Sequence, residues 1–189
     1  MSVQVQHRPF TVQEYYRLAQ VGIFKADERV ELIAGEILNM VPIGTYHASE
    51  VDRLTQFFVT NYGNNVIVRV QNPVRMDERS EPQPDLALLK PKADFYAARH
   101  PEPQDGLLLI EVADTSLEYD RTIKLPLYAK PGIPEVWIVN LPEQCIEVYA
   151  AAPDEQRYRK RKKVRVGSGK TLRLTTLPQV RIPVDEILG

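Results

Sequence analysis

The sequence predicts an α/β protein, and two apolar runs carry this prediction. The residues LLLIEV at 107–112 and VWIVN at 136–140 are almost entirely apolar, which is typical of strands buried on both faces of a sheet. A helical stretch within 116–130 separates them. A strand, a helix and a strand in this order most simply form a right-handed crossover between two parallel strands.

The composition is that of an ordinary globular protein. With 189 residues, 43% of them hydrophobic and 26% charged, the chain is long enough for one domain with a substantial core. The formal net charge of −1 excludes a basic field over the whole molecule. The single cysteine, Cys145, excludes an internal disulfide and a cysteine-rich zinc site. No run approaches the roughly 20 apolar residues that span a bilayer, so we expect a cytoplasmic protein with no membrane partner.

The first 45 residues predict a helix followed by a hairpin. Thr11 and Glu14 have the spacing of a capping box, which favours a helix over 12–20. The segment RVELIAGEILNM then predicts two strands, at 30–33 and 36–40, joined by an Ala-Gly turn.

A longer helix and two strands are expected next. The helix covers GTYHASEVDRLTQFFVTNYG, in which apolar residues recur at helical spacing and Gly63 suits the C-cap. The strands NVIVRVQ and DLALL follow, separated by a proline-rich loop over 72–84. Residues 90–106 contain three prolines and predict a loop with one helical turn.

The last part of the chain contains one irregular helix and several short strands. Pro126 lies inside the crossover helix, so either the regular helix starts near Lys124 or it is kinked there. After Asn140 short strands are expected at CIEVYA, RYRKRKKVRV and TLRL, with a closing helical turn at VDEIL. Residues 141–189 are therefore expected to form a basic, β-rich extension of a single domain.

Two acidic residues and a lysine occupy positions where chemistry is expected. Asp85 starts one apolar strand, Glu111 lies near the end of another, and Lys124 lies on the helix that follows. If the two strands are neighbours, both carboxylates lie at one edge of the sheet. Adjacent carboxylates repel unless a cation lies between them, and Mg²⁺ suits two oxygen ligands with water. A lysine beside the ion would stabilise an anionic transition state, so the set suits phosphodiester hydrolysis.

Several motifs are similar to those of a known family. The segments ELIAGEIL, GTYH, PDLALL and IEVADTSLEYDRTIKLPLYAKPGIPEVWIVN resemble the Uma-type putative restriction endonucleases of the PD-(D/E)XK nuclease superfamily. The dipeptide PD alone is common by chance, whereas the ordered set is specific. The resemblance covers most of the chain, from about residue 10 to residue 140. It implies a restriction-endonuclease-like core at 46–140, with a helix, a three-stranded meander, a crossover helix and a fourth strand in a mixed central sheet flanked by helices.

The resemblance also implies a metal-dependent site. Asp85 and Glu111 would bind Mg²⁺ or Mn²⁺. The usual motif has a lysine two residues after the second acid, but this chain has Ala113 there. Lys124, on the following helix, is the residue that matches the family's catalytic lysine. The structural alternatives are a turn residue for Asp85 and a solvated helix residue for Lys124.

Two further positions match the family, and each has a structural alternative. Glu36 matches an acid that completes the metal site, and the alternative is a hairpin residue that faces water. His47 would contact substrate or orient a carboxylate, and the alternative is a first-turn residue of its helix. For Glu111 the alternative is a structural ion pair with Arg69 or Arg121.

The basic run RYRKRKKVR is a candidate DNA contact. In a regular strand its alternate residues point the same way and could follow a phosphate backbone. They are Arg157, Arg159, Arg161, Lys163 and Arg165. An exposed edge strand that is kept from aggregating by its charges is an equal alternative. Because the whole chain is nearly neutral, acids elsewhere must offset these cations, and a polarised surface of this kind favours DNA.

These features predict a Mg²⁺-dependent DNA endonuclease, with a homodimer as the form suited to cutting both strands. The first alternative is a nuclease-fold module that binds DNA or a protein partner without cutting, and the position of Lys124 Nζ relative to the two carboxylates distinguishes them. The second is a glycosidase, with two carboxyl groups roughly 5 to 9.5 Å apart across an aromatic-lined cleft. The aromatic content of 8% and the single Trp137 inside an apolar strand disfavour it.

Overall fold

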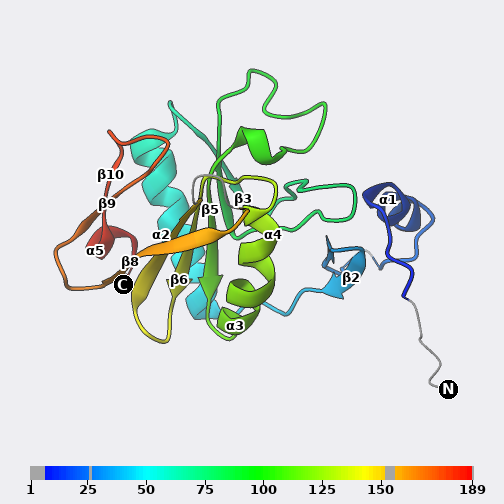
Figure 1. Cartoon of the computed structure of the whole chain (residues 1–189), viewed down its shortest axis with the longest axis horizontal. Coiled ribbons are helices and arrows are strands. Elements are labelled where there is room, and N and C mark those ends of the chain that lie inside the picture. The colour runs from blue at the N-terminus through cyan, green and yellow to red at the C-terminus, as the bar shows by residue number, and fades with distance from the viewer. Residues whose placement is uncertain (1–6, 26, 152–155, 189) are drawn as a thin grey trace.

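A mixed six-stranded sheet forms the centre of the molecule in the computed structural model, which describes residues 7–25, 27–151 and 156–188 (Figure 1). The strands are β1 (Val30–Ile33), β2 (Glu36–Asn39), β3 (Ile67–Val70), β4 (Leu86–Leu89), β5 (Gly106–Ala113), β6 (Glu135–Asn140), β7 (Cys145–Ala151), β8 (Tyr158–Arg165), β9 (Thr171–Arg173) and β10 (Arg181–Pro183). The helices are α1 (Val12–Gln20), α2 (Thr45–Tyr62), α3 (Leu117–Tyr119), α4 (Leu125–Ala129) and α5 (Val184–Ile187), with a 3₁₀ turn η1 (Pro103–Asp105) and a π-helical turn η2 (Asp120–Lys124).

The strand order of the sheet is β3-β4-β5-β6-β7-β8. The pairs β3–β4, β4–β5, β6–β7 and β7–β8 are antiparallel, while β5 and β6 are parallel. The crossover between β5 and β6 therefore runs through α3, η2 and α4, as the two apolar runs predict. The expected fold class, an α/β core with a mixed central sheet, an N-terminal helix and hairpin and a β-rich C-terminal part, is confirmed.

Each face of the sheet has its own hydrophobic core. Leu108, Ile110 and Trp137 face one side, where they pack with α2, β9, β10 and α5. Leu109 and Ile138 face the other side, where α4 and Ile133 cover them. Figure 1 shows α2 and α4 on opposite faces of the sheet. Because side chains alternate along a strand, Glu111 lies on the α4 side together with Leu109.

The N-terminal helix and hairpin lie at one end of the molecule, away from β9, β10 and α5 (Figure 1). The predicted capping box is present, since Thr11 accepts a hydrogen bond from Glu14 N–H and the Glu14 carboxylate accepts one from Thr11 N–H. The turn between β1 and β2 has positive φ at Ala34 and Gly35, as a two-residue hairpin turn requires. Glu81 N–H donates to the carbonyl of Leu32 and so ties β1 to the loop before β4.

The crossover segment contains an irregular turn where Pro126 was expected to disturb the helix. The regular helix α4 begins at Leu125, and η2, a π-helical turn, precedes it. Leu125 N–H donates to the carbonyl of Asp120, five residues back. Of the two expected outcomes, the structure has the one in which the regular helix starts close to Lys124.

Strands β7 and β8 continue the central sheet, and their pairing is irregular. The register shifts between Val148 and Tyr149, so that Glu147 pairs with Lys163 while Tyr149 pairs with Lys160. Glu147 and Tyr149 are two residues apart and share a face, so Lys160 and Lys163 also share that face. The prediction that the alternate cations of 157–165 all point one way is therefore wrong, because a bulge interrupts the alternation.

Candidate active site

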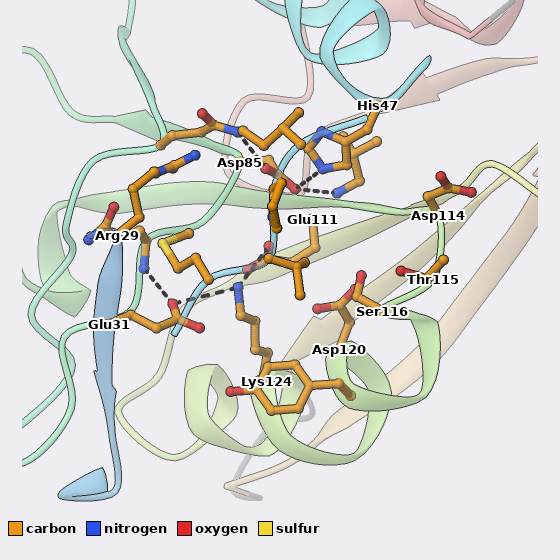
Figure 2. A pocket seen from close by; sticks show the side chains of 18 of the residues that line it. Arg29, Glu31, His47, Asp85, Glu111, Asp114, Thr115, Ser116, Asp120 and Lys124 are labelled. Atoms are coloured by element: carbon orange, nitrogen blue, oxygen red, sulfur yellow. Dashed lines mark hydrogen bonds and ion pairs between the residues drawn. The ribbon is translucent and has the colours of Figure 1, made fainter. Parts of the chain in front are cut away.

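A pocket of about 510 Å³ opens where β4 begins and β5 ends (Figure 2). The hairpin β1–β2, the start of α2 and the crossover segment form its walls. Asp85, Glu111, Lys124 and His47 all line this pocket. The structure thus brings together four of the predicted site residues, which come from four different parts of the chain.

Asp85 is held in a fixed orientation by three donors. Its Oδ2 accepts a hydrogen bond from Val112 N–H at 2.8 Å and contacts His47 Nε2 at 3.2 Å. Its Oδ1 accepts from Gln71 Nε2 at 3.1 Å. Burial alone would raise the pKa of Asp85, but His47, Val112 N–H and Gln71 together outweigh burial and hold the pKa below its usual value. Asp85 is therefore a carboxylate near neutral pH.

Glu111 is buried on the α4 face, with an exposed fraction of 3%. Lys124 Nζ lies 3.2 Å from its Oε2, and the Tyr128 hydroxyl donates to its Oε1 at 2.5 Å. Burial raises the pKa of Glu111 to about 8, despite the opposing effect of Lys124. The partner of this buried carboxyl is therefore Lys124, and not Arg69 or Arg121.

Lys124 is a buried cation surrounded by carboxyl groups. Figure 2 shows its amine between Glu111 and Glu31, and the distance from Nζ to Glu31 Oε2 is 3.8 Å. Burial would lower the pKa of Lys124, but the negative charges of Glu111, Glu31 and Asp120 together outweigh burial and raise the pKa above its usual value. Lys124 therefore stays charged, while burial favours the protonated form of Glu111. The pocket has an excess of negative charge.

His47 occupies the first turn of α2 and points at the carboxylate of Asp85 (Figure 2). The contact with Asp85 raises the pKa of His47, against the lowering effect of its burial. Its second ring nitrogen, Nδ1, is buried and has no hydrogen-bond partner among the residues that the structure describes. His47 therefore supports Asp85 directly from the wall of the pocket.

The other predicted site residues lie outside this pocket. Glu36 is exposed on β2, at the turn end of the hairpin, where it pairs with Ile33. Arg159, Arg161 and Lys163 lie on β8, which is separated from β5 by two strands. Lys163 forms an ion pair with Glu143 and lies 4.0 Å from Glu147.

Two further acids of the pocket act on the charge of Lys124, and Glu31 was not expected there from the sequence. Glu31, on the buried strand β1, accepts a hydrogen bond from Gln83 N–H and contacts Lys124. Asp120 accepts from the Ser116 hydroxyl at 2.7 Å, and burial raises its pKa. The signal for Glu31 was present, because it is an acid within the apolar strand VELI, as Glu111 is within LLLIEV.

The arrangement fits a hard divalent cation bound by few protein ligands. Within the ranges that the structure describes, no group of three or more His, Cys, Asp or Glu side chains is placed to hold a metal. Mg²⁺, however, is usually bound by one or two carboxylates and keeps several waters. Asp85 and Glu111 offer two carboxyl groups in one pocket, and acidic residues outnumber basic ones among the residues that line it. The residues present therefore fit such an ion.

The comparisons with known proteins agree with this fold. The family model described as "Uma2: Putative restriction endonuclease" matches residues 12–185. A solved structure described as a putative nuclease belonging to DUF820, from Anabaena variabilis ATCC 29413, is similar with a TM-score of 0.63 at 12% identity. That match covers 95% of this chain and 97% of the other, and at this identity it shows the fold. No match was found among curated proteins.

None of the helices in the described part of the chain is long and apolar enough to cross a membrane.

Proposed function

Because the chain belongs to the Uma2 family of putative restriction endonucleases, we propose that it is a metal-dependent DNA endonuclease that hydrolyses phosphodiester bonds. The observation that supports this most directly is the position of Lys124. Its Nζ lies 3.2 Å from Glu111 in the pocket that Asp85 also lines. A module that only bound DNA would not need to bury a lysine, at some cost, against Glu111 and Glu31.

Asp85 and Glu111 would hold the ion, Mg²⁺ or Mn²⁺. When bound, such an ion supplies a Lewis acid and lowers the pKa of a coordinated water. Asp85 is already ionised and oriented by Val112 N–H and His47. Glu111 has to release its proton before it can act as a ligand, and the nearby ammonium of Lys124 favours that release.

Lys124 would act on the reacting phosphate. Its ammonium is fixed by Glu111 and Glu31, so it needs no reorganisation when charge develops on a phosphoryl oxygen. It would neutralise that charge or position the attacking water. His47 would keep the carboxylate of Asp85 in place, and Glu31 would keep Lys124 charged.

The DNA backbone would be held outside the pocket. The exposed cations of β8, among them Arg159 and Arg161, are the proposed contacts with phosphates, together with Lys163. Cutting both strands of a duplex requires two sites, so we propose a homodimer. The cytoplasm is the expected location.

Plasmid nicking tests this proposal. With Mg²⁺ or Mn²⁺ the wild-type protein should nick DNA, and Asp85→Ala or Glu111→Ala should abolish nicking while the protein stays folded. Lys124→Met should lower kcat by about 10²–10³ and largely spare metal binding. Lys130→Met, which removes an exposed lysine just after α4, is the matched control and should behave as wild type. If the wild type cuts no DNA over a range of salt concentrations, the enzyme proposal fails and the non-cutting module takes its place.

A further inference from the structure

The crossover turn η2 carries two cations that reach two different buried carboxylates. Lys124, at the end of η2, contacts Glu111 on β5, and Arg121, near its start, contacts Glu147 on β7. Glu111 pairs with Ile138 and Ile138 pairs with Glu147, so the two acids lie in one row across the sheet. They project from the same face of the sheet, and η2 is held over them at two points.

The contact between Arg121 and Glu147 is a bidentate ion pair. Arg121 Nη2 donates to Oε1 at 2.6 Å and Nε donates to Oε2 at 3.1 Å. The side chain of Glu147 is fully buried, and Tyr149 and Lys160 contact the same carboxylate at 2.6 and 2.7 Å. A paired guanidinium and carboxylate of this geometry fix orientation as well as distance. The ion pair of Arg121 therefore fixes the distance and the orientation of the start of η2 relative to the sheet.

The backbone hydrogen bonds of η2 stabilise its conformation only weakly. Pro126 has no N–H to donate to the carbonyl four residues back, and the turn uses a five-residue hydrogen bond from Leu125 N–H to Asp120. π-helical turns are rare and are frequently found at functional sites. Lys124 has a long side chain, and holding it in one buried geometry costs conformational entropy. The position of Lys124 Nζ thus depends on contacts that hold the turn from outside.

We propose that Arg121, bound to Glu147, is a positioning residue for Lys124. It holds η2 against the sheet so that Lys124 Nζ stays between Glu111 and Glu31. Arg121 is not among the residues that line the pocket, so it acts only through the turn that it shares with Lys124. The effect on catalysis rests on the proposed nuclease function, whereas the effect on Lys124 does not.

A matched pair in the same chain separates positioning from ordinary stabilisation. Arg75 Nε lies 2.9 Å from Glu81 Oε2, and the Glu81 side chain is also fully buried. The exposed fractions of the two arginine side chains are similar, 41% for Arg75 and 31% for Arg121. Arg75 lies on the loop before β4 and does not line the pocket. Arg75→Met is therefore the control for Arg121→Met.

The first measurement is lysine labelling of the full chain with an amine-reactive reagent, read by mass spectrometry without metal. Lys124 should react slowly in wild type and in Arg75→Met, and several times faster in Arg121→Met, with Lys130 as the internal reference. Arg121→Lys should restore most of the protection, and it remains informative if Arg121→Met fails to fold. Equal Lys124 labelling in all four proteins would overturn the proposal.

The second measurement is nuclease kinetics with Mg²⁺. Arg121→Met should lower kcat by about tenfold to a hundredfold with little change in KM, since a small displacement of a catalytic group acts on the chemical step. Arg75→Met should leave kcat unchanged at a temperature where both variants are folded. Equal kcat values for Arg121→Met and Arg75→Met would contradict a positioning role. If wild type shows no cleavage, the nuclease proposal fails by itself, and the labelling result still decides the role of Arg121.

Discussion

Glu111→Gln should make the metal-free protein more stable, and the gain should grow with pH. Glutamine has nearly the shape of a protonated carboxyl group and can keep the hydrogen bond with Tyr128. Well below pH 4.5 Glu111 is protonated in both the folded and the unfolded chain, so the substitution changes little. At higher pH the unfolded chain ionises this group freely, whereas the folded protein resists its ionisation, because burial raises the pKa from 4.5 to about 8.

The size of the effect follows from this difference in pKa. A group whose pKa is raised on folding gives its full stabilisation below the unfolded pKa, and this is lost as pH rises toward the folded pKa. Between pH 4.5 and pH 8 the folded state binds one more proton than the unfolded state, so this group lowers the free energy of unfolding by about 1.4 kcal/mol per pH unit. Over the whole window the wild type should lose about 5 kcal/mol relative to Glu111→Gln, as an order of magnitude.

Urea unfolding at pH 5, 6, 7 and 8 with a chelator present measures this. The difference in unfolding free energy between Glu111→Gln and wild type should rise steadily with pH. Glu147→Gln is the control, because the ion pair with Arg121 and Lys160 lowers the pKa of Glu147 to about 2 despite its burial. That variant should therefore lose a constant amount over the same range. If wild type and Glu111→Gln give parallel curves from pH 5 to pH 8, Glu111 is ionised throughout and the account of the pocket's charge is wrong.

Three further substitutions, one of them with a matched control, test the pocket and the hairpin. His47→Gln should destabilise the protein at pH 6 but not at pH 9, because the raised pKa of His47 gives a stabilisation that is present below its usual value and lost as pH rises; thermal unfolding at both pH values checks this. Glu31→Gln should lower the rate of DNA nicking by about tenfold, since Lys124 loses one carboxylate partner, whereas exposed Glu36→Gln should leave the rate unchanged. Gly35→Ala should cost about 2 kcal/mol or more in urea unfolding, since φ is +84° there and an added Cβ would lie 2.4 Å from Pro9 Cβ; an unchanged midpoint would contradict the hairpin geometry.

The features that the sequence predicts well are those fixed by neighbouring residues. The capping box of Thr11 and Glu14 and the two-residue hairpin turn depend on a few consecutive positions. The parallel pairing of β5 and β6 followed from two apolar runs with a helix between them. Asp85 and Glu111 could be placed in one pocket because each lies at the same edge of adjacent strands.

The features that the sequence does not reveal depend on contacts between distant segments. Glu36 and Glu31 lie on the same hairpin, and only the packing of that hairpin against the crossover segment decides that Glu31 faces Lys124. The bulge in β7–β8 likewise depends on the partner strand, since nothing within RYRKRKKVR marks the extra residue. The pairing of Arg121 with Glu147 depends on the register of three strands.

The site draws Glu31 from a two-stranded hairpin, Asp85 from the central sheet and Lys124 from a connection that is fixed only when β6 pairs with β5. A growing chain on the ribosome therefore exposes both acids long before it can close the pocket around the lysine. Contacts of such long sequence separation form late, after shorter loops have closed. Chains that stop short of β6 should therefore lack the closed pocket.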